Sequence, residues 1–121
     1  MNKNLSLLYV EDEENIREEM IEILGLDFEK IYSASNGKEG LELYFQHRPD
    51  VIISDIQMPV MDGISMSKEI LSNNKDAKII LTTAFNEKTY IDEAMALGIH
   101  GYINKPIHID ELFKKIEAII V

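Results

Sequence analysis

Short apolar runs alternate along this chain with longer segments in which apolar residues recur every three or four positions. The short runs, several of them rich in β-branched residues, predict β-strands of a sheet that is buried on both faces. They cover residues 5–10, 30–33, 51–55, 78–82 and 100–104. The longer segments predict helices with one apolar stripe. Their stripes cover residues 16–24, 41–45, 64–71, 90–97 and 112–120.

The stretch from Val51 to Pro59 organises the rest of the chain. It opens with three consecutive β-branched residues, which indicate a central strand, and Pro59 cannot donate a hydrogen bond to a neighbouring strand. The strand is therefore expected to end near Asp55, which places a carboxylate at its C-terminal end. Ligands of open parallel sheets bind at this edge, although a lone aspartate could equally begin a polar turn.

Each predicted strand is followed by one helix, and no linker, repeat or low-complexity segment interrupts the alternation. This alternation predicts one α/β domain over residues 1–121, with five parallel strands and five helices that cover both faces of the sheet. We expect the flavodoxin-like, doubly wound strand order 2-1-3-4-5. In that order the topological switch point lies between the first and third strands.

Composition narrows the range of partners. The net charge of −10 argues against direct nucleic-acid binding and fits a divalent cation or a basic protein surface better. The absence of cysteine excludes disulfides, thiolate metal sites and thiol catalysis. No apolar run is long enough to span a membrane and no signal peptide is recognisable, so we expect a cytoplasmic protein without a membrane segment.

Reactive side chains follow several of the predicted strands. Glu11 and Asp12 follow the first strand, Asp55 ends the third, Thr83 follows the fourth and Lys105 follows the fifth. Because parallel strands end at the same edge, we expect these side chains to share one cleft, with Asp12 facing Asp55. Each residue alone could be a helix cap or part of a turn, but those explanations do not account for the joint placement.

Clustered carboxylates at this edge require a counter-charge. Two carboxylates about 5 Å apart repel each other by roughly 3 kcal/mol at an effective dielectric constant of about 20. Oxygen ligands without cysteine or clustered histidine favour Mg²⁺, which binds one or two carboxylates together with phosphate oxygens. A neighbouring ammonium and hydroxyl suit a phosphoryl group, and aspartate can itself become phosphorylated. The pattern therefore predicts a Mg²⁺-dependent phosphoryl acceptor.

At these residues the sequence resembles the receiver domain of two-component response regulators, from the first strand to the last helix. Four segments at predicted strand ends carry the resemblance. They are Glu11-Asp12, residues 54–63, Thr83-Ala84, and Tyr102 with Lys105-Pro106. Each segment is a weak signal by itself, but all four in order at strand ends are a specific one.

The resemblance implies a role for each acidic residue. Asp55 would accept a phosphoryl group from a phosphohistidine of a sensor histidine kinase or a phosphotransfer protein. Mg²⁺ would be bound by the carboxylates of Asp12 and Asp55 and by the main-chain carbonyl of Gln57, while Glu11 would act through a metal-bound water. The domain would assist its own phosphorylation and dephosphorylation without being an enzyme in the usual sense.

The resemblance also implies a switch. Lys105 and the hydroxyl of Thr83 would contact the phosphoryl oxygens. Thr83 and Tyr102 would form a pair that is repositioned on phosphorylation. This would reshape the face made by the fourth helix, the fifth strand and the fifth helix, where an output partner or an output domain would bind.

Three positions deserve separate mention. His108 stands where the family often has an acidic residue after the Lys-Pro pair, so the start of the last helix is expected to be less firmly fixed. Gln57 and Phe85 occupy variable positions beside the phosphorylation site, and such positions tune how fast the family loses its phosphoryl group.

Three alternatives stay open at this point. A haloacid-dehalogenase-type phosphatase also uses a strand-end aspartate, but it needs a second acid where Gln57 stands. A flavodoxin-like FMN carrier needs a phosphate-binding loop where the acids of residues 11–14 stand. The chain could also be the N-terminal receiver part of a larger regulator, with a DNA-binding or other output domain beyond Val121.

Overall fold

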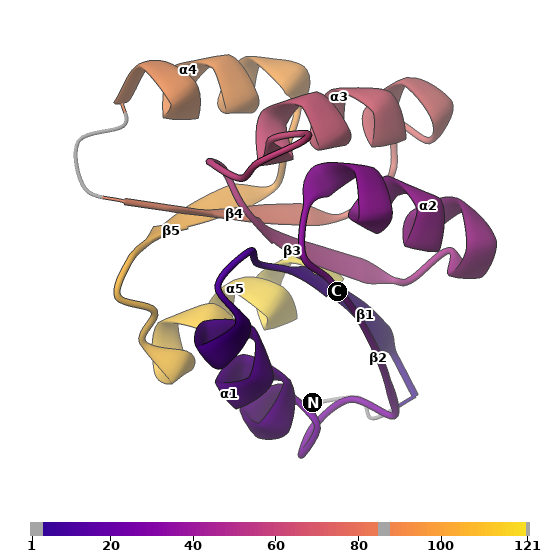
Figure 1. Ribbon diagram of the computed structural model, residues 1–121, viewed down its shortest axis with the longest axis vertical. Helices are drawn as coiled ribbons and strands as arrows, with labels where there is room; N and C mark the ends of the chain where they lie inside the picture. The colour runs from indigo at the N-terminus through magenta and orange to yellow at the C-terminus, as the bar shows by residue number, and fades with distance from the viewer. Residues whose placement is uncertain (1–3, 85–87, 121) are drawn as a thin grey trace.

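The computed structural model describes residues 4–84 and 88–120, which form alternating strands and helices (Figure 1). The strands are β1 (Ser6–Val10), β2 (Lys30–Ala34), β3 (Val51–Asp55), β4 (Ile79–Thr83) and β5 (Gly101–Asn104). The helices are α1 (Glu14–Leu24), α2 (Gly37–His47), α3 (Gly63–Asn73), α4 (Lys88–Leu97) and α5 (Ile109–Ile120). Within these residues, no helix has the length and apolar character needed to cross a bilayer.

The strands form one parallel sheet in the order β2-β1-β3-β4-β5, which confirms the predicted topology. The strand order reverses between β1 and β3, and open sheets of this kind bind ligands outside the carboxyl ends of these strands. Tyr9 of β1 pairs in register with Ile53 of β3. The residues that follow β1 and those at the end of β3 therefore lie side by side at the carboxyl edge.

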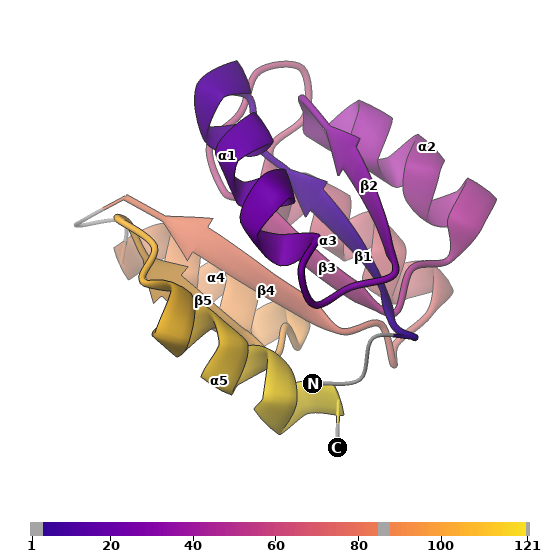
Figure 2. The same ribbon diagram turned by 90° about the horizontal axis from the view of Figure 1, so that it is seen from below.

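Helices cover both faces of the sheet. Figures 1 and 2 show α1 and α5 on one face and α2, α3 and α4 on the other. Because successive side chains of a strand point to opposite faces, the strands divide their apolar residues between two cores. In β1, Leu7 and Tyr9 belong to the core under α1 and α5, whereas Leu8 and Val10 belong to the core under α2, α3 and α4.

Side-chain caps define the starts of two helices. Asn36 accepts a hydrogen bond from the amide of Glu39 at 2.9 Å and so caps α2. Asp62 accepts one from the amide of Ser65 at 2.7 Å and so caps α3. Each cap satisfies a main-chain donor in the first turn, which is why both helices begin earlier than their apolar stripes predict.

Two aromatic residues at the ends of predicted apolar stripes are exposed. Phe45 of α2 is 40% exposed and Tyr90 of α4 is 42% exposed. In α2 the buried face is formed by Tyr44 and two glycines, and a Cβ at Gly40 would approach the Met66 sulfur to 2.9 Å. Glycine thus allows α2 to lie close to its neighbours without contributing to the apolar pattern.

The loop between β3 and α3 is held against the end of β3. The amide of Gly63 donates to the carbonyl of Ile56 at 2.7 Å. A Cβ at Gly63 would overlap the main-chain carbonyl of Asp55, so this close approach requires glycine. The loop therefore supports the main chain of Asp55 at the carboxyl edge.

Candidate functional site

Three acidic side chains meet at the carboxyl edge of the sheet. Glu11 and Asp12 follow β1, and Asp55 is the last residue of the neighbouring strand β3. One carboxylate oxygen from each residue lies within 4.8 Å of the other two. The structure thus brings Asp12 and Asp55 to one cluster, as the strand order predicts.

Lys105 enters this cluster from the end of β5. Its Nζ lies 3.0 Å from Glu11 Oε1 and 2.9 Å from Asp55 Oδ2, so a single ammonium bridges two carboxylates. Its amide donates to the carbonyl of Thr83 at 2.8 Å, and the peptide bond to Pro106 is cis. The clustered acids in the sequence predict a bound cation that relieves the carboxylate repulsion. Part of that task is performed by a side chain of the protein.

Burial disfavours charge on the two bridged carboxylates. Glu11 is 1% exposed and Asp55 is 9% exposed. Burial raises the pKa of both carboxyl groups above the ordinary range, and hydrogen bonds from Lys105 offset only part of this effect. Burial lowers the pKa of Lys105, but its hydrogen bonds to Asp55 and Glu11 outweigh it and raise the pKa. The bridge therefore favours the charged form of all three groups and opposes the effect of burial on each.

Main-chain and hydroxyl groups fix the orientation of Asp55. The amide of Ile56 donates to Asp55 Oδ1 at 2.9 Å, while Oδ2 accepts from Lys105. The hydroxyl of Ser54 donates to the Asp55 carbonyl at 2.9 Å, on the same carbonyl that Gly63 approaches. Both the carboxylate and the main chain of Asp55 are therefore held in one orientation at the carboxyl edge.

Asp12 and Gln57 are exposed to solvent beside the buried pair. Neither Glu11 nor Asp12 is the N-cap of α1, which is Glu13, so the capping explanation for these acids was wrong. Glu11 Oε2 instead accepts from the amide of Glu13 at 3.2 Å. Gln57 stands two residues after Asp55, where a dehalogenase-type phosphatase needs an acid, and an amide cannot exchange a proton in that role.

Thr83 and Tyr102 belong to the opposite face of the sheet from Lys105 and Asp55. Thr83 ends β4, is buried, and its hydroxyl donates to the carbonyl of Ala84 at 3.1 Å. Leu81, two residues earlier on the same face, belongs to the core under α2, α3 and α4 and pairs in register with Tyr102. Strand alternation therefore places Thr83 and Tyr102 on the face that α4 covers.

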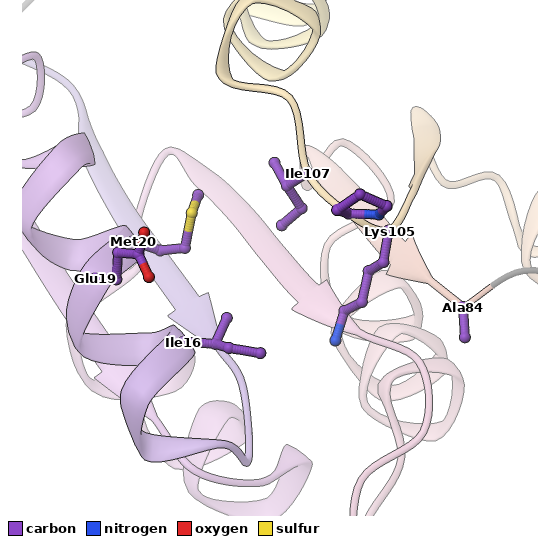
Figure 3. A pocket seen from close by; sticks show the side chains of 7 residues that line it. Ile16, Glu19, Met20, Ala84, Lys105 and Ile107 are labelled. Carbon is purple, nitrogen blue, oxygen red and sulfur yellow. The ribbon is translucent and has the colours of Figure 1, made fainter.

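A pocket of about 490 Å³ opens beside the cluster, between α1 and the connection from β5 to α5 (Figure 3). Ile16 and Met20 of α1 face Ile107 across it, and Lys105 extends from its edge. Most of the lining is apolar. The pocket therefore provides both space and an apolar surface directly beside the acidic cluster.

The donor set of this cluster fits Mg²⁺. Three carboxylates can each offer an oxygen, and neither histidine nor cysteine belongs to the cluster as the described residues form it. Mg²⁺ prefers oxygen ligands and keeps several waters, and exposed Asp12 lies on the side from which waters can enter.

Comparison with known proteins gives the family. The family model described as response regulator receiver domain matches residues 7–117, a segment that includes every residue of the cluster. The chain belongs to the receiver domains of response regulators. The resemblance found in the sequence is therefore confirmed, and so is the flavodoxin-like fold class.

This receiver domain has relatives of very different length. It is 38% identical over 100 residues to chemotaxis protein CheY of Halobacterium salinarum, a match that covers 83% of each chain. It is 38% identical over 106 residues to regulatory protein AtoC of Escherichia coli, which covers 88% of this chain and 23% of AtoC. A solved chain of the CheX-CheY-BeF3-Mg²⁺ complex from Borrelia burgdorferi matches with a TM-score of 0.89 and 25% identity, covering 97% of this chain and 90% of that one.

Arg17 of the receiver domain was not predicted as a site residue from the sequence. The guanidinium of Arg17, on α1, donates from Nη1 to the main-chain carbonyl of Glu11 at 2.8 Å. This bond ties α1 to the loop that carries Glu11 and Asp12. A signal was present in the sequence, because Arg17 is the only lysine or arginine between residues 4 and 29, a segment rich in acids.

Two positions that depart from the family pattern have different outcomes. His108 directly precedes α5, and its carbonyl accepts from the amide of Leu112 at 3.0 Å, so the first turn of the helix forms without an acidic cap. Phe85 lies outside the described residues.

Proposed function

We propose that this receiver domain accepts a phosphoryl group on Asp55. The observation that carries the proposal is the position of the Asp55 carboxylate, 2.9 Å from the Lys105 ammonium and within 4.8 Å of carboxylate oxygens of Glu11 and Asp12. Glu11 also contacts Lys105, but it is 1% exposed against 9% for Asp55, so a donor reaches Asp55 more easily.

The proposed reaction moves a phosphoryl group from nitrogen to oxygen. A carboxylate oxygen of Asp55 forms a bond to phosphorus while the N–P bond of a phosphohistidine breaks. The second ring nitrogen of that phosphohistidine carries a proton, so the donor histidine leaves as neutral imidazole. The Lys105 ammonium is placed to stabilise negative charge on the phosphoryl oxygens. Water later hydrolyses the acyl phosphate, which restores the carboxylate and releases inorganic phosphate. The domain thus assists two steps of its own cycle and is not an enzyme in the usual sense.

Mg²⁺ is the proposed cofactor. The carboxylates of Asp12 and Asp55 and the main-chain carbonyl of Gln57 would hold it, and Glu11 would act through a water. When bound, the ion offsets the negative charge of the carboxylates and of the incoming phosphoryl group. Arg17 holds the loop of Glu11 and Asp12 in place for this task.

Thr83 and Tyr102 are the proposed switch residues. Thr83 adjoins the site at the end of β4, and both residues belong to the face that α4 covers. The Thr83 hydroxyl would turn to the phosphoryl oxygens, and Tyr102 would follow into the space that it leaves. This transition would favour a second conformation of the α4–β5–α5 face through contacts made only in the phosphorylated state.

The proposed donor is a sensor histidine kinase or a phosphotransfer protein, and the apolar pocket beside Lys105 offers such a donor a contact surface next to the acidic cluster. The proposed output partner or output domain binds the α4–β5–α5 face, where Tyr90 and Met95 are 42% and 47% exposed. The net charge of −10 supports protein partners over nucleic acid, and a cytoplasmic location suits a cytoplasmic kinase. The match covers most of the CheY relative but only 23% of AtoC, so the relatives include both short chains and longer regulators. Either arrangement is compatible with the proposed function.

The experiment that tests the phosphoacceptor is labelling with acetyl phosphate and Mg²⁺, followed by intact-mass analysis. The wild-type protein should gain one phosphoryl group, and Asp55→Asn should gain none. Asp76→Asn, an exposed aspartate at the opposite edge of the sheet, is the matched control and should be labelled like the wild type. Labelling of Asp55→Asn at the wild-type rate would remove Asp55 as the acceptor.

A second measurement tests the metal ligands. Asp12→Ala deletes one oxygen ligand and should weaken Mg²⁺ binding strongly, while Mg²⁺ should raise the melting temperature of the wild type by mass action. An unchanged Mg²⁺ titration for Asp12→Ala, or a melting temperature indifferent to Mg²⁺, would contradict the assignment.

A further inference from the structure

Two buried hydroxyls stand out among the described residues because neither has a hydrogen-bond partner. They belong to Tyr9 on β1 and Ser67 on α3. Tyr9 is 1% exposed and Ser67 is fully buried. A buried hydroxyl without a partner destabilises a fold, so each position calls for an explanation.

The Tyr9 hydroxyl lies near the acidic cluster, whereas Ser67 lies in the layer of α2, α3 and α4. Tyr9 and Glu11 are two residues apart and point to the same face, and Tyr9 pairs with Ile53, two residues before Asp55. Burial raises the pKa of the Tyr9 hydroxyl, and the charges of Glu11 and Asp55 raise it further, as expected for a phenol close to both carboxylates.

Glu11 is the cluster member that phosphorylation leaves with fewer partners. Its two oxygens accept from Lys105 and from the amide of Glu13, at 3.0 and 3.2 Å. A phosphoryl group on Asp55 carries more negative charge than the carboxylate it replaces and attracts the Lys105 ammonium toward its own oxygens. Glu11, at 1% exposure, then keeps the amide of Glu13 and the proposed metal-bound water, and a further donor would stabilise it, because a buried carboxylate that loses its ion pair is strongly disfavoured.

We propose that Tyr9 is a positioning residue whose hydroxyl donates a hydrogen bond to the Glu11 carboxylate when Lys105 turns to the phosphoryl group on Asp55. The inference rests on the proposed function of Asp55. The unpartnered hydroxyl destabilises the resting form and gains its partner in the phosphorylated form. Tyr9 therefore shifts the equilibrium toward the phosphorylated conformation.

The surroundings of Tyr9 leave room for this movement. Tyr9 shares its core with Met20, and Ile16 and Ile107 pack against that core. The same three side chains line the pocket of about 490 Å³ at whose edge Lys105 lies (Figure 3). The core that contains Tyr9 thus borders open space, so Lys105 and the phenol can shift without displacing a close-packed core on every side.

The test compares Tyr9→Phe with Ser67→Ala in the whole chain. Each change removes one unpartnered hydroxyl, and both should raise the melting temperature of the ligand-free protein by a few degrees. The probe for the phosphorylated form is beryllofluoride with Mg²⁺. Tyr9→Phe should weaken beryllofluoride binding on the order of tenfold, the effect of losing one hydrogen bond to a charged group, while Ser67→Ala should leave it unchanged.

A spectroscopic readout follows the hydroxyl itself. Adding beryllofluoride and Mg²⁺ to the wild type should shift a tyrosine absorption band to longer wavelength, because the phenol begins to donate to a carboxylate. The component that comes from Tyr9 should be absent from Tyr9→Phe and present in Ser67→Ala, whereas a component from the proposed switch residue Tyr102 should persist in both variants. These spectra report the environment of the phenol, which a purely structural role would leave unchanged.

The outcomes separate the two proposals. If the wild type binds beryllofluoride and Tyr9→Phe binds it equally well, the role of Tyr9 is refuted and that of Asp55 stands. A lower melting temperature of ligand-free Tyr9→Phe would also refute it, because the hydroxyl would then have its partner in the resting form. If the wild type fails to bind beryllofluoride at all, both proposals fall.

Discussion

Lys105 and Asp55 are 50 positions apart in the sequence, and their Nζ and Oδ2 atoms lie 2.9 Å apart. The same ammonium lies 3.0 Å from Glu11 Oε1. Two largely buried carboxylates therefore share one counter-charge, and the stability of the carboxyl edge depends on a single side chain.

Lys105→Met should lower the free energy of unfolding at neutral pH by about 1–3 kcal/mol, because it leaves two neighbouring carboxylates without their partner. The Lys105 side chain is 26% exposed, so the loss should be smaller than for a fully buried pair. Urea denaturation gives the value. Lys75→Met removes an exposed lysine at the opposite edge and should change stability by less than about 0.5 kcal/mol. Equal effects of the two substitutions would contradict the importance of the bridge.

The raised pKa values of Glu11 and Asp55 should make Mg²⁺ binding depend on pH. Binding needs ionised carboxylates, so affinity should fall as the pH drops. The fall should begin above the ordinary pKa values of 4.5 for Glu11 and 3.8 for Asp55. Mg²⁺ titrations across the acidic range measure this midpoint. A midpoint at the ordinary values would show that burial has no such effect.

Without metal, the contribution of Glu11 and Asp55 to stability should depend on pH in the opposite direction to Mg²⁺ affinity. A carboxyl group whose pKa is raised on folding binds its proton more tightly in the folded state. Its contribution to stability is full below the unfolded-state pKa and is lost as the pH rises through the folded-state pKa. Mg²⁺ should therefore stabilise the protein most above that range, where the carboxylates are charged, and melting curves with and without Mg²⁺ test this.

Gly63→Ala should destabilise the protein by about 1–3 kcal/mol, because a Cβ at this position overlaps the carbonyl of Asp55. The loop would have to move, so phosphorylation of Asp55 should slow as well. Gly101→Ala is the matched control, since its Cβ would meet only the end of the Lys115 side chain at 3.7 Å. Similar melting temperatures for the two variants would argue against a close-packed loop.

Arg17→Met should weaken Mg²⁺ binding several-fold while changing the melting temperature little. The substitution removes the 2.8 Å bond to the Glu11 carbonyl and frees the loop that carries Asp12. Lys75→Met again serves as a control for the loss of one positive charge. Arg17→Lys keeps the positive charge, but a lysine reaches the Glu11 carbonyl with different geometry, so we expect it to restore Mg²⁺ affinity only in part. Full recovery in Arg17→Lys would show that the charge matters and the hydrogen bond does not.

Val60→Asn should raise stability by about 1 kcal/mol, because Val60 has a φ of 71° and is 77% exposed. A β-branched residue is strained in this left-handed region, whereas asparagine tolerates it. Thermal and urea denaturation measure the gain, and Leu26→Asn, which replaces another exposed apolar residue, gives the baseline for the change in polarity. A gain no larger than that baseline would show that the main chain at Val60 is not strained.

The sequence was sufficient to predict the sheet and the meeting of the acids. Buried runs and their spacing identify the strands, and parallel strands must end at one edge, so the proximity of Asp12 and Asp55 followed from topology. The bridge by Lys105 did not follow, because it depends on how far a long side chain reaches in three dimensions. The unpartnered hydroxyl of Tyr9 could not be predicted either, because a tyrosine within an apolar run is indistinguishable from any other core residue.

The differences between apolar stripes and buried helix faces have one physical origin. Apolar periodicity shows which side of a helix is hydrophobic but not whether a neighbour covers all of it, so Phe45 and Tyr90 belong to predicted stripes and are nevertheless exposed. Conversely, glycines give no hydrophobic signal, and Gly37 and Gly40 proved to be buried contact points of α2.

The side chains at this edge meet because each lies two residues after a core residue of its strand. Tyr9 and Ile53 point to the α1 and α5 layer, Glu11 and Asp55 come two positions after them, and Lys105 stands in the same relation to Ile103 on β5. Deleting one residue within any of these strands would turn its remaining side chains to the opposite face of the sheet. The charged side chain at the strand end would then point away from the cluster. Insertions and deletions should therefore be tolerated far less in these strands than in the turns at the opposite edge of the sheet, regardless of which residues are inserted or deleted.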